Sequence, residues 1–180
     1  MARLEAPPET PQAAVDVVAE AMRQNLLFDR LRQQLTPEQD RLLRAACLYR
    51  VPVSADGLLA LEVDAGQAET NYQRLVTYAL LEQAADPVYQ LDYFAIPPVV
   101  KELVGRNGGD ASEFRTLHQA MGQYHRFQGQ HLSKRWSDYI EAIYHFRQVE
   151  VHEAADELAE RICGFYYRVS NYADASLLTA

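Results

Sequence analysis

Histidines offer the first possibility of chemistry in this sequence, because a neutral imidazole is a common ligand for zinc. His118 and His125 lie seven residues apart, a spacing that places both on one face of a helix. A loop around Gly129 could bring His131 close to them as a third ligand. The flanking residues are polar, however, and no HxxxH or CxxC pair is present. We therefore predict that the chain binds no metal ion.

Two pairs of a carboxylate and an imidazole have the spacing of neighbours on a helix. Glu141 and His145 are four residues apart, and so are His152 and Asp156. Such a pair can act as acid and base when it lies in a cleft, but it is more common as a contact on a helix surface. We expect surface contacts here.

Nucleophilic and nucleotide chemistry lack their usual sequence signals. Cys47 and Cys163 lie in apolar helical patterns, where a thiol packs as a small core side chain, and neither has the basic loop neighbour that favours a thiolate. The sequence contains no GxSxG nucleophile elbow and no GxxxxGK[ST] phosphate loop. We predict free cysteines, no enzyme activity, no ATP binding and no cofactor.

Composition indicates an acidic, folded protein. The 180 residues are 48% hydrophobic, which is ample for a buried core, and the formal net charge of -8 opposes binding to polyanions. No apolar run approaches the roughly 20 residues of a membrane-spanning helix, and the N-terminus lacks the layout of a signal peptide. We expect a cytoplasmic protein without a membrane partner. A Pro-rich start and a final helical pattern without a stop signal indicate a piece excised from a longer chain.

The elements that must position these residues begin with two helices. Apolar residues at steps of three and four predict an amphipathic helix over 12–34. The chain then restarts at LTPEQ, where Thr36 can cap, Pro37 suits the first helical position and Gln39 completes a capping box. This signal predicts a second helix over 37–49.

Two further helices are expected before any strand. Pro52 blocks continuation of the second helix, and Ser54 can cap a short third helix over 55–61. After a turn, helical spacing of apolar residues resumes and predicts a fourth helix over 67–81.

A β-hairpin and a closing helix follow. Ala-Asp-Pro forms a turn between two short runs, and apolar residues alternate in the second run. Two prolines end the hairpin, and PPVVKELV resumes as a short helix. The alternating residues are Tyr89, Leu91, Tyr93 and Ala95, and the prolines are Pro97 and Pro98.

The glycine-rich segment GRNGGD is the best internal boundary. It divides the chain into a flexible start with a long helix over 1–35, a winged-helix-like domain over 36–107 and a helical region over 108–180. The order of three short helices, a hairpin and a closing helix is that of a winged helix-turn-helix. We therefore predict a mainly α fold.

The helical region begins with a stripe of large side chains on one helix, which is followed by a loop around Gly129. Two longer helices are expected over 133–148 and 152–168, with another starting near 171. Ala142 and Ala154 are assigned to the close contact between the two longer helices, because close helix approach needs small side chains. The stripe comprises Phe114, Leu117, Met121, Tyr124 and His125.

Three stretches together resemble the winged-helix segment that follows the nucleotide-binding module in STAND NTPases. They are AACLYRVPV at a helix end, LVTYALLE at another helix end and FAIPPVVKE at the exit from the hairpin. This family of signal-transduction ATPases includes apoptotic scaffolds, plant immune receptors and bacterial regulators and antiphage sensors. The C-terminal region resembles the tetratricopeptide-type repeats that follow this segment in many members. The usual tryptophan and glycine positions are not filled, however, so an irregular array of helical hairpins is an equal alternative.

The resemblance implies a non-catalytic fragment that relays the state of a sensor between a nucleotide-binding module and helical repeats through protein contacts. Arg74 and Tyr78 on the fourth helix, and Tyr166 and Tyr167 near the end, are the candidate protein-contact residues. The alternative is a winged-helix DNA-binding transcription regulator. Because Arg74 is the only cation in 67–81, the sequence makes a nucleic-acid partner unlikely. The oligomeric state stays open.

Overall fold

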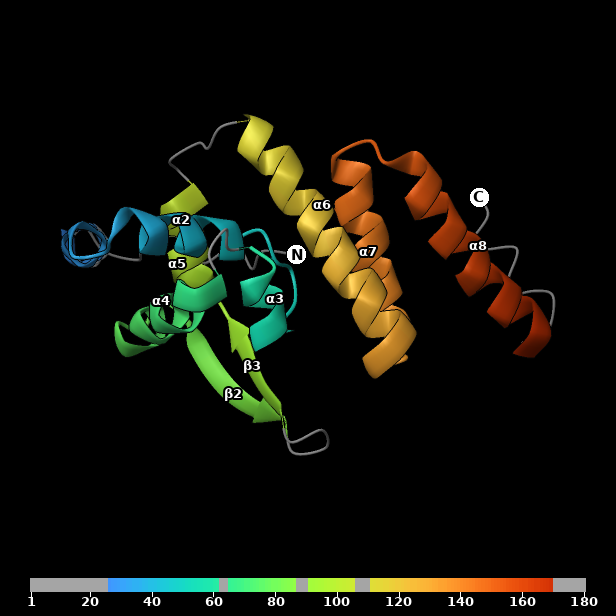
Figure 1. Cartoon of the computed structure of the whole chain (residues 1–180), viewed down its shortest axis with the longest axis horizontal. Coiled ribbons are helices and arrows are strands. Elements are labelled where there is room, and N and C mark those ends of the chain that lie inside the picture. The colour runs from blue at the N-terminus through green and yellow to red at the C-terminus, as the bar shows by residue number, and fades with distance from the viewer. Residues whose placement is uncertain (1–25, 62–64, 87–90, 106–110, 170–180) are drawn as a thin grey trace, which may run out of the picture.

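The computed structural model describes residues 26–61, 65–86, 91–105 and 111–169. It is mainly helical with a small three-stranded antiparallel sheet, and three long helices follow the sheet-containing part (Figure 1). The order agrees with the predicted winged helix. The elements after a helical stretch at 26–33 are α2 (Pro37–Ala46), β1 (Val53–Ser54), α3 (Ala55–Leu59), α4 (Ala65–Thr77), β2 (Glu82–Asp86), β3 (Leu91–Ala95), α5 (Pro98–Gly105), α6 (Ala111–Phe127), the π-helix η1 (Gln128–Leu132), α7 (Trp136–Gln148) and α8 (His152–Val169).

The start of α2 is stabilised by the predicted capping box. The Gln39 backbone N–H donates to Thr36 Oγ1 at 3.3 Å, and the Thr36 backbone N–H donates to Gln39 Oε1 at 3.1 Å. Two of the N–H groups that a helix start leaves without partners are thereby satisfied. The helix ends at Ala46, three residues before the expected end.

Replacing Thr36 with alanine is expected to lower the free energy of unfolding by about 0.5–2 kcal/mol, because the cap hydrogen bond is lost. Thr116→Ala is the matched control, since Thr116 lies exposed within α6 and caps no helix. Chemical denaturation of both variants measures the difference. Equal stability of the two variants would contradict a role for the capping box.

The sheet has the strand order β1-β3-β2, with Phe94 of β3 opposite Val53 on one side and Gln83 on the other. Phe94 is buried and its ring packs 5.1 Å from that of Tyr72 on α4. The predicted alternating residues therefore do not form the core face, because Leu91 is exposed and Tyr93 and Ala95 are half-buried on the opposite face. Tyr89, the first of the predicted alternating residues, lies outside the described residues.

The prolines mark element boundaries as predicted. Pro52 lies between α2 and β1, Pro97 precedes α5, and Pro98 is its first residue. Ser54 precedes α3 but does not cap it with its side chain. Its hydroxyl instead pairs with Tyr124 Oη on α6 at 3.1 Å, a tertiary contact that local sequence does not reveal.

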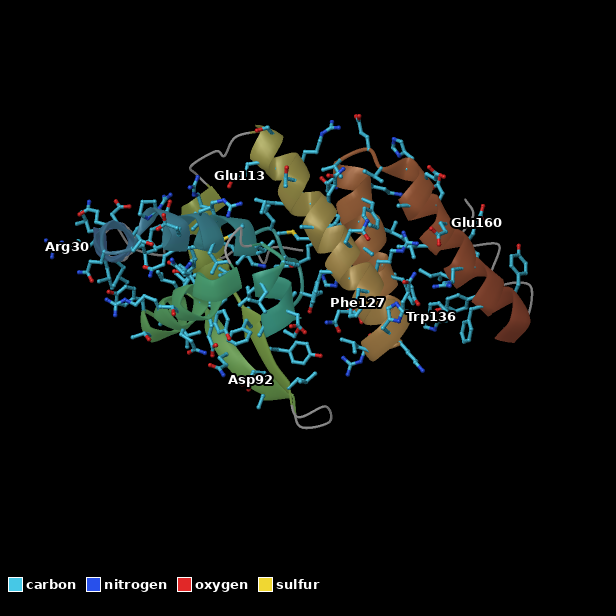
Figure 2. All side chains as sticks on the ribbon, in the orientation of Figure 1. Arg30, Asp92, Glu113, Phe127, Trp136 and Glu160 are labelled. Carbon is cyan, nitrogen blue, oxygen red and sulfur yellow. The ribbon has the colours of Figure 1, made fainter. Side chains whose placement is uncertain are left out.

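A hydrophobic core joins the winged-helix elements to α6. Leu42, Leu43 and Leu75 are buried together with Leu117 and Met121 of α6. A polar contact also joins α2 to α6, since Arg41 Nε donates to Glu113 Oε1 at 2.6 Å. Figure 2 shows Glu113 near the start of α6, on the side of the winged-helix part. The division of the chain into three regions remains a prediction, and its glycine-rich boundary lies outside the described residues at 106–110.

Helices α7 and α8 form the predicted hairpin around a separate core, whose largest fully buried side chain is Phe146. Ala142 is fully buried as expected, whereas the fully buried alanine of α8 is Ala155, and Ala154 packs at the edge. The expected loop around Gly129 is instead the π-helix η1, where a Cβ on this glycine would lie 3.1 Å from the Tyr139 ring.

The described part of the helical region, 111–169, shows the hairpin but does not show tetratricopeptide-like repeats. The third helix expected near 171 falls outside the described residues. Within the described ranges, no helix has both the length and the apolar character needed to cross a membrane.

Candidate ligand cleft

A cleft of about 550 Å³ lies between the outer face of the β2–β3 hairpin and the helices α6, η1 and α7. Its size is that of a pocket for a small organic molecule. Glu82, Tyr93 and Ala95 line it from the hairpin, and Tyr124 lines it from α6. The wing of the winged helix is therefore one wall of the cleft, and the helical region is the other.

Glu141 is unusual for a carboxylate that lines a cleft, because its side chain is only 7% exposed. Its Oε2 atom makes no hydrogen bond within the described structure, and the Arg50 Nε atom lies 3.7 Å away. That distance permits attraction between charges but exceeds a hydrogen bond. The Arg50 guanidinium also lies over the Tyr144 ring, 4.1 Å from its centroid.

Asp138 lies one helical turn before Glu141 and also lines the cleft. It accepts a hydrogen bond from the Ser133 hydroxyl, and its Oδ1 lies 3.5 Å from His125 Nδ1. His125 is almost fully buried, and neither of its ring nitrogens has a hydrogen-bond partner among the described residues. The cleft thus contains two buried polar groups whose hydrogen-bonding capacity is unused.

Three buried histidines meet behind the cleft. His118 Nδ1 and His145 Nδ1 are 2.9 Å apart, so one ring donates to the other. The His145 ring stacks on that of His125 at 5.7 Å between centroids, and Tyr49 contacts both rings by its edge. Burial, with repulsion from the other two histidines and Arg50, lowers the pKa of His145 to about 3, and burial also lowers the pKa of His118. These two imidazoles are therefore neutral near pH 7.

The expected surface pair of Glu141 and His145 is wrong. Both residues are buried, and each has a different partner, because Glu141 lies beside Arg50 whereas His145 contacts His118 of α6. His152 and Asp156, in contrast, are exposed on α8, as expected.

The structure also separates the three histidines considered as metal ligands. His118 and His125 are buried, whereas His131 is exposed and packs against Phe127, with 4.8 Å between the centroids. In the described ranges, no three His, Cys, Asp or Glu side chains are grouped so that they could hold a metal ion.

Sequence reasoning missed the meeting of His118, His125, His145 and Glu141. The available signal was that His118 and His125 follow the buried stripe of α6, which Leu117 and Met121 also occupy. Spacing on one helix predicts that His118 and His125 share a face, and likewise Glu141 and His145. Their convergence depends on how α6 and α7 pack.

None of the predicted contact residues lines the cleft, and they form two separate pairs. Arg74 and Tyr78 are neighbours at the end of α4, where the guanidinium lies over the ring at 4.4 Å and donates to its hydroxyl. Near the end of α8, Tyr166 packs against the core of the hairpin, whereas Tyr167 is 47% exposed. As expected for adjacent helical residues, these two tyrosines do not share one core face. Whether either pair contacts a protein remains a prediction.

Cys47 and Cys163 are both free thiols, as predicted, but each is half-buried and not fully enclosed in a core. Burial raises the pKa of Cys47 to about 11, and the positive charges of Lys101 and Arg32 offset only part of this effect. The Cys47 thiol therefore stays protonated near pH 7 and is a packing residue.

No family model matches the chain, and no curated protein matches it. One similar solved structure is the adhesin competence repressor AdcR from Streptococcus pyogenes, at 17% sequence identity and a TM-score of 0.34, covering 77% of this chain and 96% of that chain. Both values are too low to support an argument about function.

The expected membership in the STAND NTPases is corrected by these findings, since no model of that or any other family matches. The residues that carried the resemblance explain the error. Ala46, Tyr49, Leu81 and Phe94 are all core positions of the sheet-containing part. These side chains pack the core of a winged helix, so their pattern does not distinguish one family from another.

Proposed function

We propose that this protein is a winged-helix transcription regulator that binds duplex DNA through α4 and the adjoining β2–β3 hairpin, without catalytic activity. The observation that carries the proposal is the outward face of α4, which is left uncovered by the other elements that the structure describes. Gln67, Thr70, Gln73, Arg74 and Thr77 are all exposed on this helix. Amide, hydroxyl and guanidinium groups are the side chains that form hydrogen bonds with base edges in the major groove.

The helix-turn-helix arrangement supports the same function. Helix α3 precedes α4, and the hairpin follows directly, as in proteins that insert the second helix into the major groove. Figure 1 shows α4 on the side of the molecule away from α8. A duplex could therefore approach α4 without contacting the helical region.

The charge of this face predicts the character of the binding. Arg74 is the only cation in α4, and Glu69, Glu82 and Asp92 are exposed close to it in sequence or on the adjoining hairpin. Non-specific attraction to phosphates should therefore be weak, and affinity should decline only slightly with salt, with a slope of about -1 in a double-logarithmic plot. Binding would depend on a specific base sequence.

The test is selection of bound duplexes from a random-sequence pool at low salt, followed by fluorescence anisotropy on the enriched sequence. We expect Gln73→Ala to weaken binding by about 5- to 150-fold, because one good side-chain contact to a base contributes about 1–3 kcal/mol. Gln119→Ala on the exposed face of α6 is the matched control and should leave binding unchanged. Failure to enrich any sequence at low salt would refute DNA binding.

The acidic balance of the same face favours a second candidate function, a regulatory module that contacts a protein partner. Here the paired Arg74 and Tyr78 would be the contact on α4, and Tyr167 would extend a partner surface if α7 and α8 begin a helical-repeat array. A photo-crosslinking residue at position 78 should then capture one defined partner. Arg74→Glu should abolish that capture, whereas Arg161→Glu on α8 should not.

A further inference from the structure

We propose that the cleft between the β2–β3 hairpin and the α6–α7 helices binds a small organic cation, an amine attached to an apolar or aromatic group. This proposal rests on the geometry of the cleft and does not depend on DNA binding. Neither the sequence signals nor the comparisons point to a ligand at this position.

Unused hydrogen-bonding capacity indicates that the cleft is built for a ligand. Glu141 Oε2 and both ring nitrogens of His125 are buried without hydrogen-bond partners in the described structure. A buried polar group without a partner destabilises the folded chain, and more so if the group is charged. A molecule bound in the cleft can supply the missing hydrogen bonds and so remove this destabilisation.

The charges of the lining favour a cation. Three carboxylates, those of Glu82, Asp138 and Glu141, face one guanidinium, that of Arg135. Arg50 offsets part of the Glu141 charge, but at 3.7 Å and with a side chain that is 48% exposed it does not fully satisfy the carboxylate. An ammonium group carries up to three N–H donors and no acceptor, so it complements two neighbouring carboxylates.

The remaining surface suits an apolar or aromatic group attached to that amine. Tyr93 and Tyr124 lie in opposite walls of the cleft, and Pro52, Ala84 and Ala95 add apolar surface. Aromatic rings also attract cations through their negative faces. Glu141 and Asp138, one helical turn apart on α7, would hold the ammonium, while the tyrosines contact the rest of the molecule.

Matched probes can test the charge preference. The compounds 2-phenylethylamine, tryptamine, 2-phenylethanol and phenylacetate have similar aromatic groups but differ in charge, and calorimetry on the full chain measures their affinity. At least one amine should bind at least about tenfold more tightly than both the alcohol and the carboxylate. Equal binding of the alcohol, tighter binding of the carboxylate, or no binding by either amine at millimolar concentration would overturn the proposal.

Variants locate the site. Glu141→Gln keeps the shape of the side chain but removes its charge, and we expect it to weaken amine binding at least about tenfold. Glu160→Gln is the matched control, because Glu160 is exposed on α8 away from the cleft (Figure 2). If Glu141→Gln unfolds the protein, Ala84→Trp offers a second test, since it fills the cleft from the exposed hairpin face and leaves all charges in place. Amine binding that survives the cleft-filling variant would refute this location.

Discussion

Replacing Phe146 with alanine is expected to lower the free energy of unfolding by about 3–5 kcal/mol, the usual cost of removing a buried aromatic ring. Phe146 is 1% exposed and is the largest fully buried side chain of the α7–α8 core. Its ring also reaches α6, where it lies against Gly122. Chemical denaturation measures the loss. Ile140→Ala is the control, because Ile140 lies on the same helix but is 52% exposed and should cost far less.

A second substitution tests whether the ring and Gly122 touch as the structure shows. A Cβ on Gly122 would lie 2.6 Å from Phe146 Cε1, so Gly122→Ala should destabilise the wild-type chain by about 1–3 kcal/mol through overpacking. In the Phe146→Ala background the ring is absent and the new methyl group fills part of the cavity. There, Gly122→Ala should be neutral or stabilising, because alanine favours a helix over glycine by about 1 kcal/mol. Additive effects of the two substitutions would show that this contact does not exist.

Acidification is expected to destabilise the protein well above the pH at which carboxylates titrate. The pKa of His145 is about 3 in the folded chain, below its ordinary value of 6.5, and the pKa of His118 is lowered as well. Between pH 3 and pH 6.5, His145 is protonated in the unfolded chain but neutral in the folded chain. The contribution of His145 to the free energy of unfolding is therefore fully present above pH 6.5. It falls by about 1.4 kcal/mol per pH unit as the pH decreases towards 3.

Urea denaturation at pH 7 and pH 5 measures the effect, which should be about 2 kcal/mol from His145 alone, with a further loss from His118. His145→Gln removes the titrating group but keeps a hydrogen-bonding side chain beside His118, so the pH dependence should become shallower in this variant. His131→Gln is the matched control, since His131 is exposed. An unchanged pH dependence in His145→Gln would exclude the buried histidine as its source.

Local interactions explain which parts of the fold could be predicted. The capping box at Thr36, the prolines at element boundaries and the period of apolar residues act over a few positions, so the sequence itself determines the helices, the hairpin and their order. Alternation along the second strand predicts the hairpin but does not show which of its faces is buried. Phe94 is the core residue, because packing against Tyr72 of α4 decides which face is buried.

The candidate cleft depends on tertiary structure alone. Glu141 and His145 have the spacing of a surface pair, and only the packing of α7 between its neighbours makes them buried and gives them separate partners. His118 and His145 are 27 positions apart in the sequence, and nothing in the segment between them signals that the two rings meet. Spacing along one helix determines which side chains share a face. Which face meets another element is decided by the burial of apolar surface summed over the whole chain, and no short pattern in the sequence contains that sum.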